Sequence, residues 1–472
     1  MKLLGLVACL ALLFSANGCR TTLQGKDART APEVPEISLP DTWSRSADSP
    51  GQNTTPLSSW WTNFADQVML DRLSLALENP DVEIARARLR KAFAGRNTQI
   101  SDWQPRASLD TRGLFGLELD DADLDDWDAF QWNGSFDWEF DLWGQGSAAK
   151  EAASAQIDAA RFELHAIRLA AAVETAATDI QLRTLREQRD ITQRATEIAS
   201  RFALLYEKER EAGRADRAKV LRQESEVALL ERRGLEIERN HRVLQHRLAG
   251  LCGQFPTVET SEPEAQAKLE NLTPSALDLG LPADLLLRRP DLRMALARAE
   301  AAGYDAIAAE KSLLPKISLV SRGKSARDPL NQLIKSFTLG LGPSIELPLL
   351  DPSLKAKREV ADAEVDVVQA MLRASVLQGL IEVEDALANL ANLEQQAVHL
   401  QASVDRLRSV RELNQKKFNQ GLVSQVEILD VERDVLQAES DALTVRRDVL
   451  LNHLALYKAL GGGWAVDGDS HE

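Results

Sequence analysis

The chain has 472 residues, of which 44% are hydrophobic and 27% charged, a composition that indicates a folded protein with room for two or three domains. Its 72 acidic residues outnumber its 56 basic ones, which gives a formal net charge of −16. This balance argues against a nucleic-acid partner, because phosphate binding needs a basic face.

The N-terminus predicts export from the cytoplasm. Residues 1–18 have a charged start, an apolar core and a small-residue cleavage region, and we interpret them as a signal peptide. Cys19 follows directly and resembles the acylated cysteine of a bacterial lipoprotein, although Ala16 and Asn17 depart from the residues usual before it. Ordinary cleavage that leaves Cys19 a free thiol is the alternative. Residues 19–59 are polar and predict an extended tether.

The rest of the chain repeats one plan twice. Several short patterns recur about 210 residues further along, which predicts a tandem duplication. The matched pairs are Pro80-Asp81 with Pro290-Asp291, residues 105–113 with 315–323, and Gly213 with Gly421. We therefore expect a first copy at 60–250, a connector at 251–282, a second copy at 283–464 and a tail at 465–472. In the exported chain Cys252 is the only cysteine besides Cys19, so no disulfide framework is expected.

Each copy predicts a helix that starts at a proline, two strands, and then a helix of unusual length. Between Ser147 and Arg210 there is neither proline nor glycine, and apolar residues recur at steps of four and three. This seam consists of Ala148, Ala152, Ala155, Ala159, Phe162, Ala166, Leu169, Val173, Ala176 and Ile180. The first eight positions recur 208 residues later as Ala356, Val360, Ala363, Val367, Ala370, Ala374, Leu377 and Ile381. A coiled-coil dimer is one interpretation, but the alanines favour close lateral packing of several helices. Gly213 and Gly421 predict the tip turns into returning helices.

The strands of both copies alternate between apolar and polar residues. In residues 132–144, WNGSFDWEFDLWG, aromatic side chains lie on one face and acids on the other, and residues 337–349 show a similar alternation. A soluble sheet is one interpretation. The export signal and the five tryptophans between residues 103 and 143 favour strands that cross a bilayer, with Asp137, Glu139 and Asp141 lining the lumen.

Strands are also the element left for crossing a membrane, since no later stretch holds the roughly 18 to 20 apolar residues that a membrane helix needs. Four strands cannot close around a channel, and a membrane barrel has no free edges. Three chains with four strands each would close a twelve-stranded barrel, and their long helices would form a tube beneath it.

From Trp60 to Trp464 the chain resembles the outer membrane factors, the TolC-like and NodT-like channels of tripartite efflux pumps. The resemblance rests on residues 60–64 (WWTNF), 140–144 (FDLWG), 281–291 (LPADLLLRRPD), 342–344 (GPS) and 456–464 (LYKALGGGW). It implies a mostly α fold with a trimeric, twelve-stranded transmembrane β-barrel that continues as a long periplasmic α-helical barrel. It also implies a homotrimer in the outer membrane of a Gram-negative bacterium, with a periplasmic adaptor and an inner-membrane pump as partners.

The resemblance further implies a periplasmic entrance narrowed by acids, in the pattern Gly-x5-Asp-x-x-Asp. Here Gly421 is followed by Glu427 and Asp430 at these positions. Three chains would bring six carboxylates around one axis, where mutual repulsion favours bound cations or raised pKa values. The alternative is that the two acids belong to a solvated helix face.

A basic residue that helps to lock the entrance in some relatives is replaced here by Val423. Lys219 and Arg222 lie 208 residues before the two entrance acids, at equivalent places of the first copy. Our hypothesis is that these bases pair with the acids across adjacent tips and hold the entrance shut. Exposed pairs contribute only about 0 to 1 kcal/mol each, so several would have to act together.

Motifs for catalysis, metal binding or a cofactor are absent, and we expect neither an enzyme nor a cofactor. The acidic run at 118–128 lacks the glycine and the closing glutamate of a calcium loop and predicts an extracellular hairpin loop. The predicted function is passive conduction of small molecules out of the cell. An exported coiled-coil scaffold and, within the family, a protein-secretion duct are the alternatives, and the sequence does not distinguish drugs, metal ions or polypeptide as cargo.

Overall fold

The structure is a computed structural model that describes residues 40, 42–43, 61, 64–120, 123–256, 268–274, 282, 285–324 and 338–462. Side chains are not described at 112–132, 287, 324, 338 and 339. The predicted signal peptide, Cys19, most of the tether and the tail lie outside this description. The prediction of a loop at 118–128 is wrong for most of that run, because the structure has strand up to Asp120 and again from Asp123, which extends the pairing as far as these two residues. The chain forms two compact units, one from Met1–Glu36, Ala92–Ile157 and Leu296–Ala370, and the other from Ile37–Lys91, Asp158–Ala295 and Met371–Glu472.

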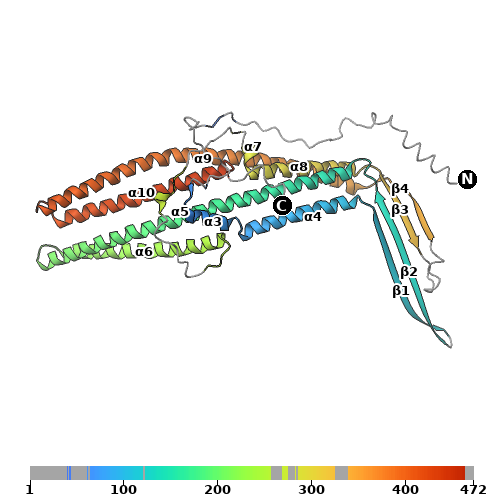
Figure 1. The fold of residues 1–472 in the computed structure, drawn as a ribbon, viewed down its shortest axis with the longest axis horizontal. Helices are drawn as coiled ribbons and strands as arrows, with labels where there is room; N and C mark the ends of the chain where they lie inside the picture. The colour runs from blue at the N-terminus through green and yellow to red at the C-terminus, as the bar shows by residue number, and fades with distance from the viewer. Residues whose placement is uncertain are drawn as a thin grey trace. The chain divides into compact units, whose positions relative to one another are not determined.

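The same order of elements occurs twice along the chain (Figure 1). The first series is α4 (Pro80–Asp102), β1 (Arg106–Asp120), β2 (Asp123–Glu139), α5 (Gln145–Glu211) and α6 (Arg217–Leu251). The second is α8 (Pro290–Lys311), β3 (Lys316–Lys324), β4 (Thr338–Glu346), α9 (Pro352–Asn419) and α10 (Gln425–Ala459). The short helices α3 (Gln67–Ala76), η2 (Leu269–Asn271) and α7 (Leu285–Arg288) lie outside these series. The long helices have 67 and 68 residues and the returning helices 35 each.

The first unit contains an antiparallel sheet in the order β1-β2-β3-β4. Because side chains alternate along a strand, the register sorts them onto two faces. One face is mainly apolar and carries Ala107, Leu109, Phe136, Trp138, Ile317, Leu319, Leu341 and Ile345. The opposite face is mainly polar and carries Arg106, Ser108, Asp110, Asp137, Glu139, Lys316, Ser318, Arg322, Ser344 and Glu346. The apolar face is uncovered at Leu109, Leu341 and Ile345, which are 64 to 67% exposed.

The FDLWG stretch joins β2 to α5 in this unit. Asp141 accepts hydrogen bonds from the backbone N–H groups of Gly146, at 3.0 Å, and Ser147, at 2.8 Å, and so caps the new helix. The indole Nε1 of Trp143 donates to the carbonyl of Pro315 at 2.7 Å. Gly146 lies against the Trp103 ring, which would be 2.4 Å from a Cβ there. This stretch therefore sets the passage from strand to helix.

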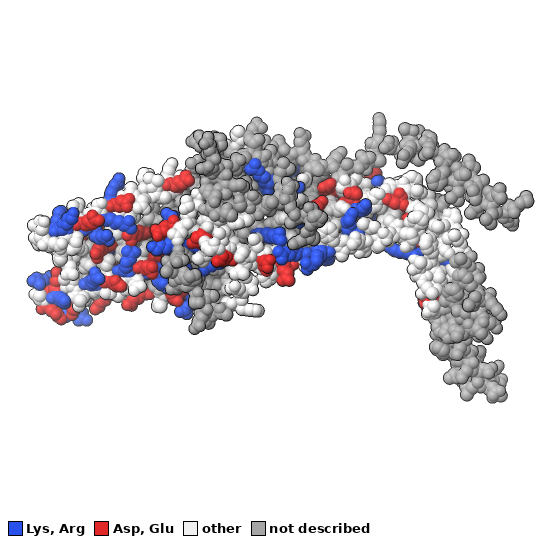
Figure 2. Space-filling view, in the orientation of Figure 1, with Lys and Arg blue, Asp and Glu red and all other residues white. Residues whose placement is uncertain are grey.

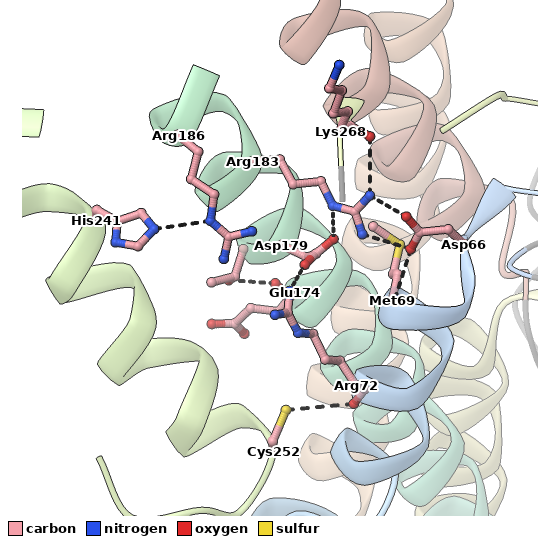
Figure 3. A network of polar contacts seen from close by, with 11 residues as sticks. Asp66, Met69, Arg72, Glu174, Asp179, Arg183, Arg186, His241, Cys252 and Lys268 are labelled. Carbon is pink, nitrogen blue, oxygen red and sulfur yellow. Dashed lines mark hydrogen bonds and ion pairs between the residues drawn. The ribbon is translucent and has the colours of Figure 1, made fainter. Parts of the chain in front are cut away.

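The second unit has an apolar core that joins α3, α5, α10 and the connector. Beside it lies a buried network of charges around Arg183, whose side chain is fully buried (Figure 3). Its guanidinium donates to Asp66 at 2.6 and 2.8 Å, to Asp179 at 2.7 Å and to the carbonyl of Lys268 at 3.3 Å. Arg72, which lies on α3, also pairs with Asp179. Burial raises the pKa of Asp66, but the hydrogen bond and charge of Arg183 outweigh burial and leave that pKa lowered.

A second buried arginine, Arg289, binds the C-terminal end of α10. Arg289 donates to Asp291 at 2.8 Å, to Glu382 of α9 at 2.8 Å and to the carbonyl of Ala459 at 3.0 Å. Gly461 has a φ of +77°, and a Cβ there would be 2.6 Å from the carbonyl oxygen of Arg288. The LRRPD and GGG stretches, which are far apart in the sequence, are thus in direct contact.

Within the described ranges we find no helix long and apolar enough to cross a membrane.

Candidate functional site

The α5–α6 and α9–α10 turns lie at the same end of the second unit (Figure 1). Gly213 and Gly421 have φ values of +70° and +72°, in the left-handed region that glycine adopts without strain. In each turn the next residue's N–H reaches back to a helix carbonyl, from Arg214 to Glu209 at 2.7 Å and from Leu422 to Lys417 at 2.9 Å. The structure therefore places both predicted glycines where the long helices end.

The two helical hairpins, α5–α6 and α9–α10, contact each other on the side of these turns. Ile198 and Phe202 of α5 form a buried cluster with Leu429 and Leu436 of α10. Glu439 follows Leu436 by three residues on α10, and its side chain is 15% exposed; its carboxylate accepts from Arg194 of α5 at 3.2 Å and from Arg408 of α9 at 2.8 Å. One carboxylate thus joins three helices, a contact that sequence reasoning did not identify.

The two predicted entrance acids both have local partners. Glu427 belongs to a capping box at the start of α10, in which its carboxylate accepts from the backbone N–H of Ser424 at 3.3 Å and from its hydroxyl at 3.1 Å. Asp430 lies 3.4 Å from Arg433, one turn further along α10. Ser-x-x-Glu is a recognisable capping signal, so this role of Glu427 could have been predicted from the sequence.

The two predicted locking bases lie in the first turns of α6. Asp216 caps this helix by accepting from the backbone N–H of Lys219 at 2.9 Å. The Lys219 ammonium lies 6.0 Å from the centre of the Tyr206 ring, at the outer limit of a cation–π contact. Among the described residues of this single chain, neither Lys219 nor Arg222 pairs with the entrance acids. The hypothesised lock is therefore not formed within one chain.

Charges of both signs are interspersed over the hairpins, with no large area of one sign on the face in view (Figure 2). Local pairs account for part of this pattern: Glu207 and Arg210, just before the first turn, are 2.6 Å apart. The hydrogen bond from Arg210 lowers the pKa of Glu207. The tips are solvated and carry mixed charge.

The three acids predicted to line a lumen have different surroundings in the first unit. Asp137 accepts from Arg322 at 2.8 Å, and Glu139 lies 3.9 Å from Lys316, so both face bases on β3. Asp141 caps α5, as described above. Sequence reasoning missed the two bases, although Arg322 belongs to the repeated stretch at 315–323.

The described residues contain no group of three or more His, Cys, Asp or Glu side chains that could hold a metal ion. Cys252 is a buried free thiol whose pKa is raised by burial.

Comparison with known proteins decides the family. The sequence profile described as outer membrane efflux protein matches residues 73–254 and 281–462, most of the chain. The chain belongs to this family. It is 28% identical to the pyoverdine export outer membrane protein OpmQ of Pseudomonas putida, over 92% of this chain and 94% of the relative. It is 26% identical to nodulation protein T of Rhizobium leguminosarum, over 92% and 89%.

Solved structures agree with this assignment. The outer-membrane channel OprN superposes with a TM-score of 0.76 at 26% identity, covering 92% of this chain and 99% of that one. The open state of the Neisseria gonorrhoeae MtrE outer membrane channel gives a TM-score of 0.79 at 22% identity, over 91% and 97%, and supports the fold alone. The predicted family is confirmed. Its members are outer membrane efflux channels, not enzymes.

Proposed function

We propose that this outer membrane efflux protein acts as a homotrimer, in which three chains close a twelve-stranded barrel that conducts small molecules passively. The observation that carries the proposal is the four-stranded sheet, with one apolar face, one polar face and two free edges within the chain, at β1 and β4. Free edges are not tolerated in a bilayer, and pairing β1 of one copy with β4 of the next removes them. The apolar face then meets lipid and the polar face meets water.

The long helices support the same assembly. In α5 the seam residues Ala152, Ala159 and Leu169 are 1%, 6% and 8% exposed. Their counterparts in the α9 seam are open, with Val360 70%, Val367 46% and Leu377 60% exposed. Two equivalent seams with opposite exposure are expected when a neighbouring copy covers the second one. Such a head-to-tail contact closes into a ring.

The remaining parts of the proposal extend the assembly on both sides. The tether at 19–59 would link an acylated Cys19 to the first copy at 60–250, and the connector at 251–282 would lead to the second copy at 283–464. A periplasmic adaptor and an inner-membrane pump would deliver the cargo and the energy, and the tip turns would form the periplasmic end of the tube. OpmQ is named for pyoverdine export, and for this chain we propose small molecules as the cargo class.

The entrance would be lined by the acids at 427 and 430 from three copies, six carboxylates in all. Because the bases at 219 and 222 do not pair with them within a chain, we propose that they pair between neighbouring copies. Charge reversal of both bases should then raise the conductance of the closed channel, and an unchanged conductance would reject this lock.

The proposed assembly is tested by reconstituting purified protein in planar bilayers and recording conductance. Placing charges on the α9 seam with the double substitution Val367→Glu and Ile381→Glu should abolish channels and trimers together. Val410→Glu is the matched control, because Val410 is also an exposed valine of α9, at 40%, but does not fall on the four-and-three register of the seam. Channels that survive the seam substitutions would contradict the proposal.

A further inference from the structure

The polar face of the sheet carries a close pair of opposite charges. The register between β2 and β3 places Asp137 opposite Val320 and Ser135 opposite Arg322, so Asp137 and Arg322 are diagonal neighbours on one face. The Arg322 Nη1 donates to Asp137 Oδ2 at 2.8 Å. Both side chains are open to solvent, at 64% and 44% exposure. Their charges therefore face whatever solvent covers this side of the sheet.

The described side chains of this face are close to electrical balance. Lys316 lies 3.9 Å from Glu139 and forms a second, looser pair. Among the described side chains of the polar face, three bases stand against four acids: Arg106, Lys316 and Arg322, and Asp110, Asp137, Glu139 and Glu346. Arg106 also pairs with Asp102, which lies just before the strand. Among these described side chains, removing one base would leave two bases against four acids and double the excess of negative charge.

We propose that Arg322 determines the ion selectivity of the barrel lumen by neutralising Asp137. The inference rests on the proposed function, which turns this face toward the water inside the barrel. Each chain contributes one pair, so three pairs surround the axis at one level. With all three ion pairs formed, the lumen discriminates weakly between cations and anions at this level. With Arg322 gone, three uncompensated carboxylates attract cations and repel anions.

The expected size follows from Coulomb's law with screening. Three charges about 10 Å from the axis, in water at about 0.1 M salt where the Debye length is also about 10 Å, change the local concentration of each ion about twofold. The local concentration of cations rises, and that of anions falls, by this factor. The permeability ratio of potassium to chloride should therefore rise about fourfold in the absence of Arg322.

The test is the reversal potential of the reconstituted full-length protein in a potassium chloride gradient. Arg322→Gln should shift it toward cation selectivity, and Asp137→Asn should shift it toward anion selectivity. The double substitution should restore a value close to that of the unaltered protein. Arg322→Lys keeps the charge but not the shape of the guanidinium, and it should leave the selectivity unchanged.

Two results would overturn the inference. One is an unchanged reversal potential for Arg322→Gln in channels of ordinary conductance. The other is an equal shift for Arg322→Gln and Arg322→Lys, which would assign the effect to shape. Failure of the unaltered protein to form channels would count against the proposed function instead, so the two failures are distinguishable.

Discussion

Replacing Arg183 by methionine tests the buried charge network of the second unit (Figure 3). The substitution keeps much of the side-chain volume but removes the partner of Asp66 and one of the two partners of Asp179, whose side chain is fully buried. Breaking a buried pair from one side costs about 3 to 5 kcal/mol, because a charge remains without compensation. Asp179 keeps Arg72 and Asp66 is partly exposed, so we expect the lower end, about 3 kcal/mol.

The assay is urea unfolding of the detergent-solubilised protein, followed by helical circular dichroism. Arg247→Met is the matched control: Arg247 lies 2.7 Å from Glu174, but both side chains are about half exposed, and its loss should cost about 0 to 1 kcal/mol. The lowered pKa of Asp66 adds a second signature. Its stabilisation is present above the unfolded pKa of 3.8 and is lost as the pH falls through the lower folded value, and Arg183→Met should abolish this dependence. Equal losses in Arg183→Met and Arg247→Met would refute the reasoning.

Three further predictions follow from single residues. Burial lowers the pKa of His453 to about 4, so the free energy of unfolding should fall as the pH drops below the unfolded pKa of 6.5, by about 3 kcal/mol at pH 4. In His453→Gln, urea unfolding measured between pH 7 and 4 should lack this loss, and an unchanged dependence on pH would contradict the prediction. Glu439→Gln leaves Arg194 and Arg408 facing each other, and amide hydrogen exchange near residue 439 should accelerate, whereas Asp434→Asn, at a 3.7 Å surface pair, should change little. Gly461→Ala places a Cβ at a positive φ and against the Arg288 carbonyl, so it should lower the free energy of unfolding in urea by more than about 1 kcal/mol. Gly234→Ala is the control: it lies within α6 with open space at its Cβ, and it should raise the free energy of unfolding by about 0.5 to 1 kcal/mol.

Much of the fold could be predicted from the sequence because its signals are periodic. The seam of α5 and the stretch free of proline and glycine predict one long helix, and the structure has it from Gln145 to Glu211. Gly213 and Gly421 are legible as turns because few other residues adopt a positive φ without strain. Alternation likewise predicts the amphipathic strands.

The contacts between distant segments could not be predicted in this way. Nothing local distinguishes the covered seam of α5 from the open seam of α9, because the two have the same spacing and similar residues. The docking of Arg289 against Ala459 joins residues 170 apart, and periodicity carries no information about such a contact. Asp141 looks like one more acid of an alternating strand, yet it follows the end of β2 and caps α5. Its role depends on where the strand stops, which is the least certain feature of a strand pattern.

The most direct test of the central claim is native mass spectrometry of the full chain extracted in detergent. The account predicts a trimer whose subunits begin at Cys19 and carry added lipid mass. Loss of the trimer in the charged α9 seam variant, with a trimer retained in Val410→Glu, would assign the contact to that seam. A monomer or a dimer that needs no detergent would contradict the account.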